Sequence, residues 1–429
     1  MRKENIAFVI IFIIILPLSL NYSQSYGFMN SNDSNISSAL DDGSSWIINW
    51  DNYTWRVKAI VTDISENVYC AGVIDLIPPE YYYLSNIVSF FISKINASGI
   101  NVWTLTFDYS YSFRDLEIDS DNNIYSLWYD YNEGSLLLKL NSSGSLLWNY
   151  TLKDYFYDLC LDMYGNILLL GEKYESVRLI KLNKSGAMQF NYSISIGHSI
   201  NPFVLRIDEF NNTYIAVFVY GHIQHLGLYK VNASDELILV KELDKLFSSQ
   251  RPLFDDLGNL YVFGIDDSFS NILFKYNSSG DKIFKSTWKS LSTYIYQSFW
   301  DYVTIDNSGN IYCAGITSYF TLTMFSEIFF VAYDENGTLL GEYMWRKYHY
   351  TSLNAIHIDQ QDNIYFTGIS EIGSFLAKNP LLDDYLIYIF YFYLDEESLA
   401  TLLLVFTFFG VWSLLGISLF VYYYRKRKR

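Results

Sequence analysis

The sequence predicts an all-β protein: a seven-bladed β-propeller of four-stranded blades, closed by an N-terminal strand and followed by one C-terminal transmembrane helix. Three observations support this prediction. A ten-residue motif recurs seven times, at intervals of 56, 43, 46, 47, 51 and 53 residues. A polar, Asn-rich turn follows six of the copies, and aromatic residues, which favour strands, make up 19% of the chain. Self-similarity of this period is typical of propellers, solenoids and arrays.

The recurring motif reads Asp, two variable residues, Gly or a polar residue, Asn, an apolar residue and usually an aromatic one. Its clearest copy is DNSGNIYCAG, in which Asp306 precedes Gly309 and Asn310. We expect the aspartate to cap a tight turn between two strands, because Asp side chains accept hydrogen bonds from backbone N–H groups in such turns. The seven turn aspartates are Asp63, Asp119, Asp162, Asp208, Asp255, Asp306 and Asp359.

Each unit contains enough chain for four strands. An apolar run ends in the turn Asp, a second strand follows, and a variable loop leads to a third strand such as ILFKYN (272–277). An Asn-x-Ser-Gly turn then leads to a fourth strand that carries a large aromatic residue such as Trp103 or Trp148. Four antiparallel strands per unit, at this period, form a propeller blade.

The seventh unit lacks its own fourth strand. We expect its third strand at 386–395 (LIYIFYFYLD), which leaves no strand before the predicted membrane helix. The segment Trp46–Trp50 has the sequence type of a fourth strand without the other three. The N-terminal strand is therefore predicted to complete the last blade, so that the propeller spans 45–396. Closing the ring would remove exposed sheet edges.

This pattern resembles the SBBP-type repeats of seven-bladed β-propellers in surface and secreted proteins of prokaryotes. The resemblance covers about Trp46 to Asp395 and depends on the recurring D-x-x-G/N-N-I/L-Y core. Three copies depart from the strongest form, with Glu66, Asn122 and Asn211 where Gly would stand. The resemblance implies a propeller outside the cytoplasm, and it implies no common ligand or activity.

The two ends of the chain predict membrane targeting. Residues 1–25 have a basic start and a short apolar core, as in a signal peptide or an uncleaved anchor, and 26–44 read as a flexible linker. Residues 398–421 carry no charge, and as a helix they would be roughly 36 Å long, enough for a hydrocarbon core of about 30 Å. The basic tail, 422–429, would stay cytoplasmic. We therefore expect a single-pass cell-membrane protein with its propeller outside.

Charge and cysteine usage restrict the possible partners. Without Arg2, Lys3, Glu4 and the five basic tail residues, 22 Lys and Arg face 45 Asp and Glu, a formal charge of −23. Such an acidic surface disfavours nucleic acid and anionic lipid as partners. The three cysteines do not form a disulfide framework, and we expect Cys70, Cys160 and Cys313 to be buried free thiols.

The loops predict where a ligand would bind. In each blade the first-to-second and third-to-fourth turns are short and lie on one face, here called the short-turn face. The longer and more divergent connections lie on the other, the loop-rich face, where binding would be tuned. Aromatic rings beside acids suit sugars or peptides, although many rings could instead pack between blades. The candidate ligand-binding residues are Tyr81, Tyr82, Tyr83, Tyr111, Tyr155, Tyr157, Tyr296, Trp300, Tyr348 and Tyr350.

The sequence predicts no cofactor and no metal site. His222 and His225 could lie near each other, but no third ligand at metal-binding spacing accompanies them. Asp119 and Asp121 resemble part of a calcium loop, yet turn capping explains Asp119 without a metal. An acid pair for glycoside hydrolysis is defined by its separation in space, so the sequence identifies no catalytic residue.

Six glycosylation sequons fall at equivalent third-to-fourth-strand turns. Asn and Ser are good turn formers, so sequons can arise there without being used. We expect the short-turn face to point toward the membrane, where glycans at these positions would collide with the bilayer unless the ring tilts or the sequons stay unused. The candidates are Asn96, Asn141, Asn183, Asn232, Asn277 and Asn336.

Taken together, these features predict a membrane-anchored recognition or adhesion module for glycan or peptide ligands that acts through the loop-rich face. A glycan hydrolase or lyase and a structural cell-envelope spacer are the alternatives. Clustered acids that converge on the mouth of the central channel would favour the enzyme, whereas an aromatic, acid-poor cleft would favour the binding module.

Overall fold

The computed structural model describes residues 45–384, with gaps at 51–54, 76–86, 109–110, 174–175, 196–198, 209, 211, 221–224, 232–236, 244–247, 250, 267–269, 290–294, 320–324, 346–350, 371–372 and 380–382. The predicted signal peptide, linker, transmembrane helix and basic tail lie outside these residues. Within the described ranges, no helix has the length and apolar character needed to cross a bilayer.

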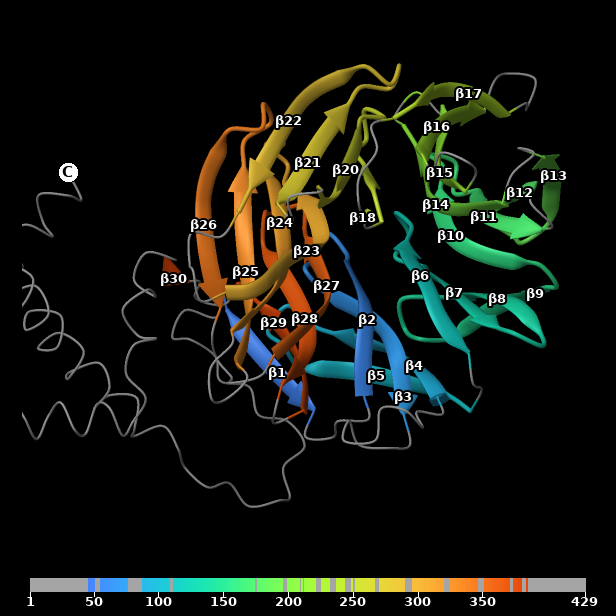
Figure 1. Cartoon of the computed structure of the whole chain (residues 1–429). Coiled ribbons are helices and arrows are strands. Elements are labelled where there is room, and N and C mark those ends of the chain that lie inside the picture. Colours follow the sequence, from blue (N-terminus) through green and yellow to red (C-terminus); the bar gives the residue numbers. More distant parts are fainter. Residues whose placement is uncertain are drawn as a thin grey trace, which may run out of the picture. The chain divides into compact units, whose positions relative to one another are not determined.

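Seven antiparallel sheets form the blades of a propeller, as predicted, with the first strands toward the middle and most fourth strands outside (Figure 1). Blade 1 contains β2 (Trp55–Thr62), β3 (Val68–Asp75), β4 (Ile87–Ile95) and β5 (Asn101–Phe107). Blade 2 contains β6 (Ser112–Ile118), β7 (Ile124–Asp130), β8 (Gly134–Leu140) and β9 (Leu146–Leu152). Blade 3 contains β10 (Tyr155–Leu161), β11 (Ile167–Lys173), β12 (Ser176–Leu182) and β13 (Met188–Ser195).

The remaining blades repeat this order with two local changes. Blade 4 contains β14 (Ser199–Ile207), β15 (Thr213–Tyr220), β16 (His225–Val231) and β17 (Leu237–Glu242). Blade 5 contains β18 (Ser248–Ser249), β19 (Leu253–Phe254), β20 (Leu260–Ile265), β21 (Asn271–Tyr276) and β22 (Lys282–Trp288). Its first strand is divided between β18 and β19, which flank Pro252, a residue without an N–H group for the ladder.

Blade 6 is the second exception, because a short fifth strand is added to its outer edge. It contains β23 (Ile295–Ile305), β24 (Ile311–Tyr319), β25 (Phe325–Tyr333), β26 (Leu339–Trp345) and β30 (Asp383–Asp384). Blade 7 contains β27 (Thr351–Ile358), β28 (Ile364–Ser370), β29 (Gly373–Lys378) and β1 (Trp46–Trp50), with β1 antiparallel to β29.

The third strand of blade 7 is not the one predicted. It is β29, which pairs with β28 from Ser370↔Gly373 to Tyr365↔Lys378, whereas 386–395 lie outside the described residues. The expectation was wrong because it assumed a long second-to-third loop, as in blade 1. Only two residues, 371–372, connect β28 to β29, the length of a tight hairpin.

The turn aspartates hold the first two strands of every blade together. Each Asp accepts hydrogen bonds from the N–H groups two and four residues later at 2.7–3.0 Å. In every blade the motif Asn also donates its side-chain amide to the second carboxylate oxygen, at 2.8–2.9 Å. The fourth turn residue has positive φ, supplied by Gly309 in one copy and by Glu66, Asn122 and Asp362 in others.

A lysine and an aromatic residue extend this turn to the next blade. Lys94 in β4 lies 4.9 Å from the ring centre of Tyr69, whose hydroxyl donates to Asp63. Lys94 Nζ and Trp103 Nε1 both donate to the Ser142 carbonyl of blade 2, at 3.4 and 3.2 Å. Equivalent bonds run from Lys139 to the Lys184 carbonyl (3.0 Å) and from Lys275 to the Glu335 carbonyl (3.3 Å).

Blade 3 shows what the tyrosine contributes, because Leu168 stands in its place. Without a tyrosine between them, Lys181 Nζ contacts Asp162 Oδ2 directly at 2.9 Å. Burial opposes ionisation of Asp162, but the bonds from Lys181 and Asn166 outweigh it and hold the pKa of the carboxyl below its ordinary value. In the blade without the tyrosine ring, the lysine and the aspartate therefore interact directly, as an ion pair.

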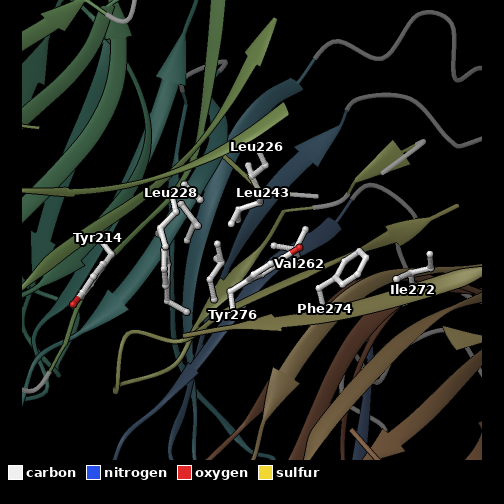
Figure 2. Close-up of a cluster of buried hydrophobic side chains, with 12 residues drawn as sticks. Tyr214, Leu226, Leu228, Leu243, Val262, Ile272, Phe274 and Tyr276 are labelled. Carbon is white, nitrogen blue, oxygen red and sulfur yellow. The ribbon is translucent and has the colours of Figure 1, made fainter. Parts of the chain in front are cut away.

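The apolar core lies between blades rather than within one sheet. Six clusters of buried side chains each draw on two neighbouring blades. Figure 2 shows the cluster between blades 4 and 5, where Leu228 and Tyr214 meet Val262, Phe274 and Tyr276. Blade 7 packs on blade 1 in the same way, through Trp46, Ile48 and Val57 among others. Each blade is therefore stabilised mainly by its neighbours.

We predict that Asp306→Ala lowers the free energy of unfolding by about 2 kcal/mol, since two backbone N–H groups and the Asn310 amide lose their acceptor. Urea unfolding of the full chain measures this change. The matched control is Ser308→Ala, which alters an exposed side chain of the same turn and keeps its backbone bond to Asp306. Equal stability of the two variants would contradict a capping role.

Candidate functional site

The first strands place different side chains at one constant backbone position. Six of them shift register at the same point, four to six residues before the turn Asp. Such a bulge inserts one extra residue and re-aims its side chain. The inserted residues are Lys58, Arg114, Tyr157, Phe203, Asp301 and Asn354. The inner surface therefore varies chemically while its backbone repeats.

An ion-pair network joins these inner strands across blades 2, 3 and 5. Asp158 in β10 accepts a bond from the Leu205 N–H at 2.5 Å and pairs with the Arg251 guanidinium. Burial raises the pKa of the Asp158 carboxyl well above its ordinary value, although Arg251 opposes this shift. Asp115 in β6 accepts from the Leu159 N–H at 2.9 Å and lies 3.7 Å from Arg251. Arg251 thus links two carboxylates from two other blades.

A second group of ion pairs lies nearer the short-turn face, at Glu117, two residues further along β6 than Asp115. Arg206 in β14 is 3.9 Å from Glu117 in β6 and 2.7 Å from Asp256 in the blade 5 turn. Burial raises the pKa of Glu117 to about 7, with Arg206 acting in the opposite direction. Glu117 can therefore hold or release a proton near neutral pH. We call Asp115, Glu117, Asp158, Arg206, Arg251 and Asp256 the axial network.

Tyrosines surround a cation where blades 2 and 3 meet the loop-rich face. The Arg114 guanidinium lies 5.0 Å from the Tyr129 ring centre and 5.7 Å from that of Tyr157. Tyr129 also packs against Tyr155 at 4.8 Å, and the Tyr157 hydroxyl donates to Glu172 at 2.7 Å. All five side chains are half-buried. These residues form the tyrosine–arginine cluster.

The chemistry of the tyrosine–arginine cluster suits a polar ligand with apolar faces. Burial lowers the pKa of Arg114, which remains a cation, and the two tyrosines favour the charge. Among the described residues, Arg114 Nε has no hydrogen-bond partner. A buried donor without a partner is unfavourable, so a ligand that supplies an acceptor would be stabilised there. The ring faces could meanwhile stack on a sugar or a peptide side chain.

The structure brings together two of the predicted ligand-binding residues, Tyr155 and Tyr157. Tyr111 is buried instead, with its ring against Phe90 and its hydroxyl bonded to Glu133 at 2.8 Å. Trp300 is 1% exposed and stacks on Trp288, so it contributes to packing between blades 5 and 6. Tyr296 lies in β23, where its side chain is not described. Tyr81, Tyr82, Tyr83, Tyr348 and Tyr350 fall outside the described residues.

Arg114, Tyr129, Glu172 and the axial network were not predicted from the sequence. Aligning the seven first strands on the turn Asp would have offered a signal, because Arg114 and Asp115 interrupt an otherwise apolar run. Asp119, once compared with a calcium ligand, accepts the bonds of its own turn. In the part of the chain that the structure describes, no group of three His, Cys, Asp or Glu residues could hold a metal ion.

Comparisons with known proteins support the fold alone. No protein-family model matches the chain, and no curated protein matches it. A streptogramin B lyase structure matches with 13% identity and a TM-score of 0.50, over 82% of this chain and 100% of that one. A putative 6-phosphogluconolactonase from Bacteroides fragilis matches with 15% identity, a TM-score of 0.43, and 69% and 89% coverage. A Bacteroides caccae protein of unknown function matches with 14% identity, a TM-score of 0.39, and 59% and 90% coverage.

We predict that Glu117→Gln stabilises the protein at pH 8 by about 1 kcal/mol and much less at pH 5. The folded-state pKa of about 7 exceeds the ordinary value for Glu, so Glu117 lowers stability as the pH rises from about 4.5 through 7. Urea unfolding at both pH values, compared with wild type, measures the difference.

The control for this change is Glu335→Gln, an exposed side chain whose removal should alter the free energy of unfolding equally at the two pH values. Loss of stability in Glu117→Gln at pH 8 would mean that its pair with Arg206 outweighs the cost of burying the carboxylate.

Proposed function

We propose that the propeller is a recognition module that binds a glycan or peptide ligand at the tyrosine–arginine cluster. The observation that supports this most directly is Arg114, held between two tyrosine rings with one donor lacking a partner. Tyr155 lies at the start of β10 and Glu172 near the end of β11, and both strand ends point to the loop-rich face. The cluster therefore lies where variable loops can add selectivity.

The ligand class follows from this combination of groups. Tyrosine faces stack on the apolar faces of sugars and on peptide side chains, and they bury area at a low cost in side-chain entropy. The guanidinium offers several donors to a carboxylate or to hydroxyl oxygens, while Glu172 accepts bonds from hydroxyl or amide donors. We therefore expect a ligand that carries an acidic group, such as an acidic sugar or a peptide with a carboxylate.

We predict that Tyr157→Ala weakens ligand binding at least about tenfold, because it removes a ring face and the partner of Glu172. Glycan and peptide arrays, probed with the full chain in phosphatidylcholine nanodiscs, identify the ligand, and titration then measures Kd. The matched control is Tyr164→Ala, an exposed ring on the short-turn face, which should bind as wild type. Equal effects of the two changes would place the ligand elsewhere.

A glycan hydrolase or lyase is the second candidate, and it is favoured by Glu117, whose pKa of about 7 suits an acid or base near neutral pH. Against it, the carboxylates of the axial network are paired with Arg206 and Arg251 rather than left free for substrate. If array glycans are cleaved, and Glu117→Gln abolishes cleavage while binding persists, the enzyme is the better description.

We further propose that the chain is a single-pass membrane protein with its propeller outside the cytoplasm. The support is in the sequence: residues 398–421 are uncharged and long enough to span a bilayer, and a basic run follows at 425–429. The resemblance of the repeats to SBBP-type surface proteins agrees with this location.

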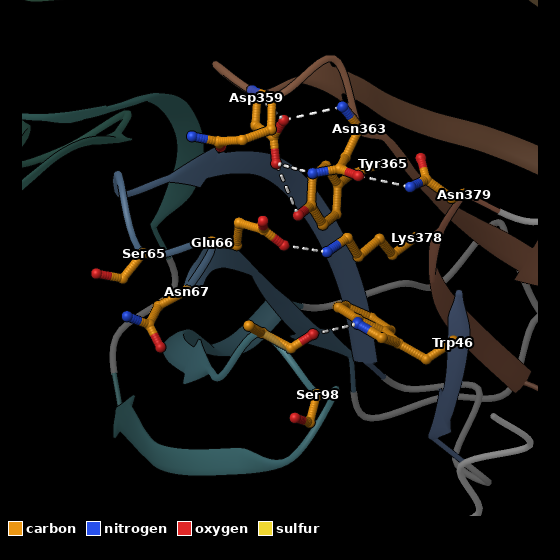
Figure 3. A network of polar contacts seen from close by, with 12 residues as sticks. Trp46, Ser65, Glu66, Asn67, Ser98, Asp359, Asn363, Tyr365, Lys378 and Asn379 are labelled. Atoms are coloured by element: carbon orange, nitrogen blue, oxygen red, sulfur yellow. Dashed lines mark hydrogen bonds and ion pairs between the residues drawn. The ribbon is translucent and has the colours of Figure 1, made fainter. Parts of the chain in front are cut away.

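We also propose that β1 closes the ring, and three contacts at the junction of blades 7 and 1 support this. Trp46 Nε1 donates to the Ala97 carbonyl at 2.9 Å, and a Cβ at Gly99 would lie 3.0 Å from the Trp46 ring. Trp103 meets Gly144 of blade 2 in the same way. Lys378 in β29 bonds Glu66 in the first turn of blade 1 (Figure 3).

We predict that Trp46→Ala opens the last blade and lowers the free energy of unfolding by about 3 kcal/mol. Hydrogen exchange of β29 amides should accelerate, because β1 covers that strand. Trp148→Ala is the control, since it removes the same type of contact, on Gly186, between two blades that are continuous in the chain. If exchange in β29 is unchanged in Trp46→Ala, closure by β1 is wrong.

A further inference from the structure

The short-turn face carries most of the exposed large apolar side chains among the described residues. Sixteen large hydrophobic residues are at least 44% exposed among those that the structure describes, and all but Tyr131 lie in or directly after a short turn. Single exposed apolar residues are common on soluble proteins and need no explanation. Fifteen at one end of the strands are more than the capped turns themselves require.

These fifteen residues occupy two kinds of position. The first is the tip of the first-to-second turn, between the capping Asp and the positive-φ residue, where the side chain points away from the blade. The tip residues are Ile64, Met163, Tyr164, Phe210 and Leu257, which are 59–74% exposed. The second kind lies at the start of the fourth strands: Ile100, Val102, Leu146, Leu147, Met188, Ile238, Leu239, Ile283, Leu339 and Leu340.

The apolar tips are not spread evenly around the ring. Four of the five belong to the consecutive blades 3, 4 and 5, whereas the tips of blades 2, 6 and 7 read Ser-Asp, Asn-Ser and Gln-Gln. In a ring of seven, blades 3 and 4 lie opposite blade 7. The chain leaves blade 7 through β29, which ends at Lys378 on the same face. From Lys378 the chain continues to β30 at the outer edge of blade 6. We call the apolar tips of blades 3, 4 and 5 the apolar arc; its blade 3 lies opposite both blade 6 and blade 7.

We propose that the short-turn face docks on a lipid bilayer, with Phe210, Leu257 and their neighbours inserted among the headgroups. This inference rests on the membrane anchor proposed above. Residues 385–397 join β30, at the edge of blade 6, to the uncharged segment, and 13 extended residues reach at most about 45 Å, so the propeller stays near the bilayer. A short tether raises the effective concentration of the membrane at every surface of the propeller. The tether would let either face of the propeller contact the bilayer. The apolar side chains favour contact through the short-turn face.

The charges at the same turns specify the kind of lipid. Asp256 stands exposed beside Leu257, and Asp121 and Asp362 stand exposed in the turns of blades 2 and 7; acidic groups are repelled by an anionic surface. The contact is therefore with a zwitterionic bilayer, through apolar insertion that high salt does not weaken. Burying four or five apolar side chains at the headgroup level, at about 25 cal/mol per Å², suffices to orient a propeller that is already tethered.

Two features of the chain agree with this orientation. The tyrosine–arginine cluster would face away from the membrane, where ligands are accessible. The sequon turns at Asn96 and Asn141, whose side-chain oxygens cap their own turns, would face the headgroups and remain without glycans. Docking at the apolar arc opposite blade 7 would hold the ring flat, so the sequons stay unused and the ring does not tilt.

The test uses single cysteine variants of the full chain in phosphatidylcholine nanodiscs. The native Cys70, Cys160 and Cys313 are buried, so an added exposed cysteine can be labelled selectively. Phe210→Cys and Leu257→Cys carry an environment-sensitive fluorophore on the short-turn face, and Tyr131→Cys, 79% exposed at the other end of blade 2, is the matched control. With bromine-labelled phosphatidylcholine we expect at least about twofold quenching at 210 and 257, insensitive to salt, and none at 131.

Three results would overturn the proposal. Quenching at 131 equal to that at 210 would show a propeller without a preferred orientation. A blue-shifted fluorophore at 210 that lipid bromine does not quench, and that depends on the number of propellers per disc, would show contact with a second copy. Glycans found at Asn96 or Asn141 in the native membrane protein would exclude close contact. Failure of the chain to enter nanodiscs would refute the anchor and with it this proposal, whereas arrays probed with the full chain in detergent micelles would still test ligand binding.

Discussion

The propeller depends on one interaction repeated seven times: a carboxylate that accepts hydrogen bonds from the backbone of its own turn. Each turn Asp satisfies two N–H groups, orders the motif Asn and, in five blades, accepts the hydroxyl of the motif tyrosine. A lysine then lies over that tyrosine and contacts the next blade. Each cap therefore connects a local turn to the packing of neighbouring blades. Because those bonds are made to an ionised acceptor, they are stronger than bonds between neutral groups.

This dependence explains why so much of the fold could be predicted from the sequence. The capped turn needs Asp at its first position, a residue that tolerates positive φ, such as Gly or Asn, at its fourth, and Asn at its fifth. These residues therefore recur in the sequence even where the strands between them differ. Blade number and strand order follow from those positions. The third strand of blade 7 could not be found in this way, because its hairpin is short and its sequence, GSFLAK, lacks the Asn-x-Ser-Gly turn. Its fourth strand comes from the other end of the chain, so no turn was needed.

The candidate site was far less predictable, for a physical reason. Arg251 meets Asp158, 93 residues away, only because bulged strands of different blades face a common axis. Residue types alone do not reveal such pairs among 46 acidic residues. The prediction that Trp300 binds a ligand did not anticipate its burial, because an aromatic side chain can pack between blades as well as line a surface. Tyr155 and Tyr157 remain predicted ligand-binding residues; the structure places both half-buried in the first strand of blade 3, near its loop-rich end.

The turn motif also indicates which surface residues the fold leaves free. In DDLGNLY, Asp255, Gly258 and Asn259 are required by the turn, and Tyr261 by the blade, whereas Leu257 donates its backbone N–H to Asp255 and leaves its side chain 59% exposed. The corresponding tips of blades 6 and 7 carry polar residues such as Asn307 and Gln361, and the Asn307 amide bonds to the blade 7 turn. Apolar tips on blades 3 to 5 therefore have no structural cause within the blade. Exposing them to water is unfavourable, so a partner is the better explanation, and under the anchor proposed above a bilayer would be the apolar surface within reach.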